Sequence, residues 1–309
     1  MRHSFPVVRQ RFKRLFGKRR EDGGSARRRD FPVVDLTALD LLTPLDALRR
    51  ANGCPFLFDC AVDDLRGPDT IGFPFSVGSG LHPFVLASIW LDSGESPRPV
   101  ESPLKIYYEL VRPGSAAEKL GLVSSSYLST LPALAARPPW STVLPGAKAI
   151  KRAEKAARKE SVAHGFAPSG ERFNITHGPV PSEILEREHH RLATLLKSVA
   201  ASGFDKSDPP RVTLLVGEGG DARAVVDAGQ HRVAVCSALG YEAVPVLVRG
   251  VVHRSEVEEW PGVVYGVFTV EEALSVFDRV FGAIPPSCIT EVWPPERAGC
   301  FALPRGGRS

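Results

Sequence analysis

The pattern of apolar and polar positions in the second half of the chain predicts two short strands with a helix between them. The apolar run Ala224–Val226 predicts one strand and Val244–Val248 predicts the other. Between them, Gln230–Leu239 predicts a short helix that ends at Gly240, because glycine readily adopts the left-handed conformation that follows many helices. Gly229 lies between the first strand and the helix, where it allows a sharp turn.

Apolar periodicity and capping residues predict further elements on both sides of this stretch. The predicted helices are Leu41–Ala51, His82–Asp92, one beginning at Ser102, Ala147–Val162, one from Pro181 or Ser182 through Ser202, and one from Thr269 to about Phe281. The run Pro55–Asp59 predicts a buried strand. Together these elements indicate a mixed α/β (α+β) fold.

Composition divides the chain into five segments. They are a basic arm at 1–30 that we expect to be disordered, a helical N-terminal leader region at 31–143, a linker and exposed helix at 144–170, a core with a C-terminal helix at 171–284, and a loose tail at 285–309. The helix expected at 144–170 is rich in Ala, Lys, Arg and Glu, which favours a solvated face over a nucleic-acid contact.

The basic arm carries most of the positive charge. Residues 1–30 contain eleven Lys and Arg and three acidic residues, so the arm is +8 and the remaining chain, with a total of +4, is −4. Phe5, Val8, Phe12, Leu15 and Phe16 recur at helical spacing among these cations. The arm is therefore either a solvated leader, a peripheral contact to an anionic membrane surface, or a nucleic-acid contact.

Composition otherwise predicts a globular protein of the cytoplasm. The basic arm is the segment expected to bind the inner face of the membrane, if the protein is peripheral to it. Apolar residues make up 43% of the chain, and no apolar run of about 18 residues predicts a spanning helix. Five cysteines at irregular spacing indicate free thiols in a reducing compartment and predict no metal site.

The residues Gly229, Gln230, His231 and Arg232 predict an anion-binding site. The first N–H groups of a helix lack intrahelical partners and carry a partial positive charge, and Gly229 allows a ligand to approach them closely. His231 and Arg232 add donors in the first turn. The alternative is an ordinary glycine turn followed by two solvated side chains.

This motif resembles the ParB/sulfiredoxin fold family. The resemblance covers residues 171–255: the helix containing His190–Phe204, the strand Val212–Val216, then Gly229-Gln230-His231-Arg232 and the Val-Pro-Val strand. It implies a ParB/sulfiredoxin-like core behind the leader. Segments of the leader also resemble uncharacterised ParB-like proteins found among surface-glycan genes.

In that family the Gly-x-x-Arg turn binds nucleotide phosphates, so the resemblance implies a nucleoside triphosphate with Mg²⁺, or another phosphorylated small molecule. It favours phosphoryl transfer or nucleotide hydrolysis if the chain is an enzyme. Gln230 stands where sulfiredoxins have cysteine, which argues against thiol chemistry. Asp227 is the nearby acid for a catalytic role, although it lies one residue earlier than in kinase-like members.

Several matters remain open from the sequence. His177 precedes the long helix and could donate to the ligand, or simply belong to a turn. We expect Glu186, Glu188, His189, His190 and Arg191 on the surface or rim of that helix. A non-catalytic, ligand-sensing or interaction module that docks through the basic arm is the alternative to an enzyme. The nucleotide, the acceptor and the oligomeric state are not specified.

Overall fold

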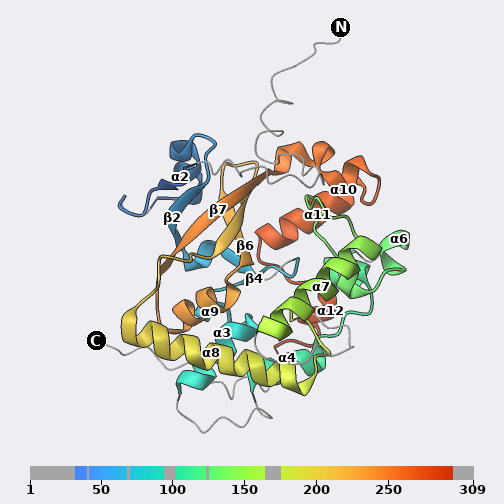
Figure 1. Cartoon of the computed structure of the whole chain (residues 1–309). Helices are drawn as coiled ribbons and strands as arrows, with labels where there is room; N and C mark the ends of the chain where they lie inside the picture. The colour runs from blue at the N-terminus through green and yellow to red at the C-terminus, as the bar shows by residue number, and fades with distance from the viewer. Residues whose placement is uncertain are drawn as a thin grey trace, which may run out of the picture.

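A seven-stranded mixed sheet runs through the centre of the molecule (Figure 1). The computed structural model describes residues 32–39, 42–67, 70–93, 102–122, 125–163 and 175–294. The order of the strands across the sheet is β1-β2-β7-β5-β6-β3-β4. None of the helices in these ranges is both long and apolar enough to cross a membrane. The mixed α/β fold predicted from the sequence is confirmed.

Strands from the second half of the chain form the centre of this sheet, and strands from the first half flank them on both sides. They are β1 (Val34–Asp35), β2 (Phe56–Ala61), β3 (Leu65–Gly67), β4 (Phe73–Pro74), β5 (Arg211–Val216), β6 (Ala222–Ala228) and β7 (Ala243–His253). The central strand β5 is antiparallel to β6 and parallel to β7. β2 pairs antiparallel with β7, and β3 pairs parallel with β6. The region expected as a helical leader therefore supplies four strands of the same sheet.

Alternating side chains of the strands enter two separate apolar clusters, one on each face of the sheet. In β5, Val212 and Leu214 join the larger cluster, whereas Leu215 joins the smaller one. Between β5 and β7 the register shifts: Val212 pairs with Val248, but Thr213 pairs with Gly250. A bulge of this kind changes which face of the sheet the following side chains point to. Side chains of the long strand β7 therefore contribute to the apolar core on both faces of the sheet.

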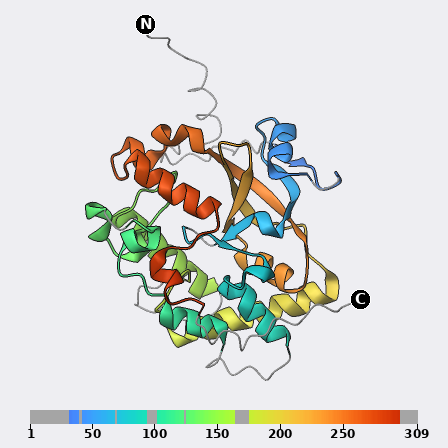
Figure 2. The ribbon, with the colours of Figure 1, turned by 180° about the vertical axis from the view of Figure 1, so that it is seen from behind.

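Helices cover both faces. The larger cluster receives α2 (Pro44–Ala51), α3 (Pro83–Asp92), α4 (Pro103–Leu110), α8 (Ser182–Ser202) and α9 (Gln230–Ala238). The smaller cluster receives α5 (Ala116–Leu120) and α11 (Val270–Phe281). In Figures 1 and 2, α3, α8 and α9 lie together at one end of the sheet, with α10 and α11 beside its other face. The remaining helices are α6 (Ser126–Ser129), α7 (Ala147–Ala163), α10 (Pro261–Val264) and α12 (Ser287–Thr290).

The helix boundaries follow the predicted capping residues. Thr43 accepts a hydrogen bond from the Asp46 N–H, and Ser102 accepts one from Lys105. Thr269 forms a capping box with Glu272. Residues 285–294 differ from the expected loose tail, because α12 is ordered and Trp293 is buried. The basic arm at 1–30 and residues 295–309 lie outside the described residues.

The four cysteines in the described part of the chain, Cys54, Cys60, Cys236 and Cys288, are free thiols, as the sequence predicts. Burial raises the pKa of Cys236 to about 12. A thiol with so high a pKa is almost wholly protonated near neutral pH, so Cys236 fills space in α9 and is a poor nucleophile.

His82 is buried in an aromatic cluster at the start of α3. Its ring stacks on Phe75 at 4.1 Å between centroids, and neither ring nitrogen has a hydrogen-bond partner among the described residues. Burial, together with the charge of nearby His231, lowers the pKa of His82 from its ordinary 6.5 to about 3. His82 therefore stays neutral in the folded protein and caps no backbone group of the helix with its side chain.

We predict that His82 lowers the stability of the fold as the pH falls from 6.5 to 5. The unfolded chain binds a proton near pH 6.5 that folded His82 does not accept, so stability falls as the pH falls. The loss is about 1.4 kcal/mol per pH unit, or about 2 kcal/mol between pH 6.5 and 5. Urea denaturation at several pH values should show a smaller pH dependence in His82→Leu than in the wild type.

The control for this prediction is His190→Leu, because His190 is exposed on α8. This variant should keep the pH dependence of the wild type. Equal pH dependence in the wild type and His82→Leu would contradict the assignment.

Candidate functional site

The predicted turn at the start of α9 has the expected geometry. Gly229 has φ +93°, a left-handed conformation that side chains disfavour, and a Cβ there would lie 3.0 Å from the Pro210 Cα and 3.1 Å from an Arg232 nitrogen. The Gln230 and His231 N–H groups find no acceptor among the described residues. The glycine thus leaves two helix N–H groups available for an anion.

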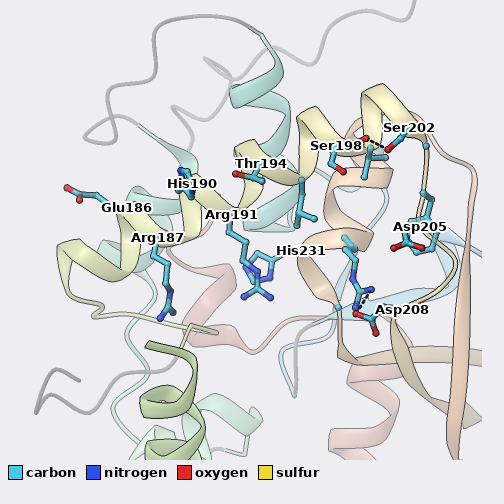
Figure 3. Close-up of a pocket in the computed structure, with 16 residues that line it drawn as sticks. Glu186, Arg187, His190, Arg191, Thr194, Ser198, Ser202, Asp205, Asp208 and His231 are labelled. Atoms are coloured by element: carbon cyan, nitrogen blue, oxygen red, sulfur yellow. Dashed lines mark hydrogen bonds and ion pairs between the residues drawn. The ribbon is translucent and has the colours of Figure 1, made fainter. Parts of the chain in front are cut away.

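A cavity of about 960 Å³ lies between α8, the loop that follows it and the start of α9 (Figure 3). Three of the predicted ligand-binding residues, Gly229, His231 and Arg232, line it, while Gln230 does not. The other lining residues come from α8 and the loop: Glu186, Arg187, His190, Arg191, Thr194, Leu195, Ser198, Val199, Ser202, Gly203, Phe204, Asp205 and Asp208.

A fully buried carboxylate joins the two helices behind this cavity. Glu188 Oε2 lies 2.5 Å from His231 Nε2, and Glu188 Oε1 accepts hydrogen bonds from Arg187 Nη2 at 2.9 Å and Nε at 3.2 Å. Burial by itself raises the pKa of Glu188, but the hydrogen bond and charge of His231, with those of Arg187, outweigh it and lower the pKa to about 2. Glu188 is therefore ionised and fixes both partners.

The bond to Glu188 limits what His231 can do. Its Nε2 is engaged by the carboxylate, and its ring packs 4.6 Å from the Phe84 ring between centroids. The side chain is almost completely buried. His231 thus contributes a fixed imidazole edge and its backbone N–H to the cavity, and Nε2 is not available to a ligand.

Arg232 has a looser environment than His231. Its guanidinium pairs with Asp208 at 3.0 Å, and the Asp208 side chain is 80% exposed. Ion pairs this exposed are worth about 0–1 kcal/mol, since water screens both charges. A phosphate that enters the cavity can therefore replace Asp208 as the partner of Arg232 at little cost.

The structure does not bring Asp227 or His177 to the cavity. The Asp227 carboxylate accepts a hydrogen bond from Thr213 Oγ1 at 2.7 Å, and alternation along β6 places it on the sheet face opposite to Val226 and α9. His177 is buried near α4, with Nδ1 2.9 Å from the Gly178 carbonyl oxygen. Neither residue lines the cavity, so this geometry gives no support to the roles expected for them.

Sequence reasoning missed the contribution of α8. Glu188 and His189 were expected on the surface or rim, but both are buried, and His189 lies 6.1 Å from the Trp90 ring between centroids. The signal was present in the helical spacing. Glu188 lies three residues after Leu185 and four before Leu192, within the apolar stripe of the helix. A charged residue in such a stripe requires a buried partner.

Two carboxylates could serve a metal ion here. The described residues contain no group of three His, Cys, Asp or Glu side chains suited to a metal. Mg²⁺ in nucleotide sites, however, is usually held by one or two carboxylates together with the phosphates. Asp205 and Asp208 line the cavity and fit that smaller requirement.

Comparisons with family models, with curated proteins and with solved structures found no match to this chain.

We predict that Glu188→Gln destabilises the protein by about 3 kcal/mol or more, because it removes the carboxylate that pairs with the buried guanidinium of Arg187 and the buried imidazole of His231. Denaturant unfolding at pH 7 measures the change. Glu186→Gln, two positions away and exposed, is the control and should change stability by less than about 0.5 kcal/mol.

The stabilisation by Glu188 should also depend on pH. Because its folded pKa is depressed from 4.5 to about 2, the stabilisation is fully present above pH 4.5 and is lost as the pH falls to 2. Similar stability of the two variants at pH 7 would show that the buried triad has no such role.

Proposed function

We propose that this chain binds a nucleotide or another phosphorylated small molecule in the cavity between α8 and the start of α9. The observation that carries the proposal is that the free N–H group of His231, at the start of α9, and a set of cationic or donor side chains meet at one cavity. The side chains are Arg187, His190, Arg191 and Arg232. Arginine presents a planar array of donors that matches phosphate oxygens, and this set suits a dianion better than a neutral ligand.

The buried triad supports the proposal energetically. A flexible arginine must lose side-chain entropy when it binds a ligand, at a cost of up to about 2 kcal/mol. Glu188 already fixes Arg187 and His231 in the protein without ligand. Part of the side-chain entropy is thus already lost when the protein folds. Less of the free energy of the ligand contacts is then offset by ordering of the cavity wall.

The order of elements supports a ParB/sulfiredoxin-like core as part of the proposal. The chain passes from α8 through β5 and β6 to Gly229, then through α9 to β7, in the order that the resemblance implies. In that family the equivalent turn binds nucleotide phosphates, and the cavity occurs at this turn. We therefore favour a nucleotide among phosphorylated ligands.

If the chain turns over its ligand, phosphoryl transfer or hydrolysis is the reaction class that fits. Asp205 and Asp208 would hold Mg²⁺ together with the phosphates, and the ion would neutralise their charge. Asp227 has no part in this proposal, because it lies outside the cavity. A ligand-sensing module without turnover uses the same contacts, and phosphate release distinguishes the two.

We predict saturable binding of at least one of ATP, CTP and GTP, measured by isothermal titration with Mg²⁺ present. Arg232→Ala and Arg191→Gln should each weaken binding about 10- to 100-fold, the value of a hydrogen bond to a charged group. Arg249→Ala removes an exposed arginine of β7 outside the cavity and should bind like the wild type.

Two results would contradict this proposal. One is the absence of saturable binding of all three nucleotides and of inorganic pyrophosphate. The other is unchanged affinity in both cavity variants, which would place the anion elsewhere on the protein.

A further inference from the structure

The helix α7 carries six cations that have no part in the candidate site. All six are exposed and none lines the cavity: Lys148, Lys151, Arg152, Lys155, Arg158 and Lys159. The helix also contains Glu154 and Glu160, so its net charge is +4. In the described part of the chain, no carboxylate forms an ion pair with any of the six cations. The fold thus leaves these charges open to an outside partner.

The cations lie on one side of α7. At about 100° per residue, the six positions fall within an arc of about 120°, and from Lys148 to Lys159 they extend for about 16 Å along the helix axis. On the opposite side Ala149 is fully buried and Ile150 is half-buried, and α7 packs there on the short 3₁₀ turn Ala133–Ala135. Composition alone favours a solvated face for this helix. The one-sided arrangement adds that a flat anionic surface can contact all six cations at once.

An exposed apolar side chain lies near each end of this row of cations. Tyr127 of α6 is 48% exposed. Its hydroxyl oxygen lies 3.5 Å from the position that a Cβ on Gly146 would take, one residue before α7, and Figures 1 and 2 both show α6 beside α7. Val162, in the last turn of α7, is 60% exposed and falls within the arc of the cations. Cations next to an exposed tyrosine and an exposed aliphatic side chain are typical of surfaces that adsorb to a bilayer.

We propose that α7, together with Tyr127 and Val162, is a docking surface for an anionic membrane. Each Lys or Arg beside an anionic bilayer strengthens adsorption about fivefold. Long lysine stems keep their charge at the lipid headgroups while the two apolar side chains enter the interface. Because the opposite side of α7 packs on the protein, the helix lies on the bilayer and does not insert deeply. This surface is separate from the basic arm and does not depend on the proposed function.

A nucleic acid is the other polyanion that a row of cations attracts. Sequence-specific readers often contact base edges through Asn or Gln, and α7 contains neither residue. A phosphate backbone binds the cations but gives no apolar environment to Val162. A bilayer offers both, since anionic headgroups lie next to acyl chains. The described residues therefore favour the membrane.

Sedimentation of the full chain with lipid vesicles tests the proposal. We expect binding to phosphatidylcholine vesicles that contain about 30% phosphatidylserine and none to pure phosphatidylcholine, with release at high salt because salt screens the contact. The triple variant Lys148→Gln, Lys151→Gln, Lys155→Gln keeps the basic arm and should bind about 100-fold more weakly. Glutamine has a helix propensity close to that of lysine, so α7 should persist.

A matched triple variant controls for the loss of charge. Arg50→Gln, Lys197→Gln, Arg249→Gln removes the same charge from exposed positions on α2, α8 and β7, and it should bind within about twofold of the wild type. The double variant Tyr127→Ser, Val162→Ser leaves every charge in place. It should weaken vesicle binding about tenfold, because it removes the apolar contacts with the interface.

Three results would overturn the proposal. One is the absence of binding to the anionic vesicles. Another is equal binding of the two triple variants, which would assign adsorption to the basic arm or to overall charge. The third is that the α7 triple variant loses affinity for an oligonucleotide duplex while its vesicle binding is unchanged, which would make α7 a nucleic-acid surface.

Discussion

The ionised carboxylate of Glu188, buried between α8 and α9, is the interaction on which the candidate site depends. A charge without solvent is costly unless it is paired and hydrogen-bonded, and Glu188 meets this requirement with His231 from one helix and Arg187 from its own. The pairing fixes how the two helices lie against each other. It thereby fixes the cavity wall, with cationic groups on one side and the start of α9 on the other.

The start of α9, which forms the second side of the site, is positioned by Gly229. β6 is a central strand, so its direction is set by pairing with β5 and β3, and Gly229 then turns the chain directly into α9. Behind α9, the rings of Phe84, His82 and Phe75 form an apolar support that keeps water from His231. Because electrostatic interactions weaken in water, this apolar packing keeps the contact between Glu188 and His231 strong.

Local elements could be predicted from the sequence, whereas their long-range relations could not. Caps at Thr43, Ser102 and Thr269 and the turn at Gly229 depend on neighbouring residues, and they are where the sequence places them. The pairing of β2 with β7 joins segments almost 190 residues apart, and no local pattern specifies it. The partner of Glu188 is likewise distant in sequence. The position of Asp227, by contrast, could have been predicted. Side chains alternate along a strand, so Asp227 points to the sheet face opposite to Val226 and α9.

The central claim is that an anion binds at the first N–H groups of α9. Amide NMR of the ¹⁵N-labelled protein during titration with inorganic phosphate tests it most directly, because each N–H reports its own hydrogen bond. The account predicts saturable shifts that are largest at Gln230 and His231 and that appear also at Arg191 and Arg232. Unchanged resonances at Gln230 and His231, with shifts only at scattered surface lysines, would contradict it.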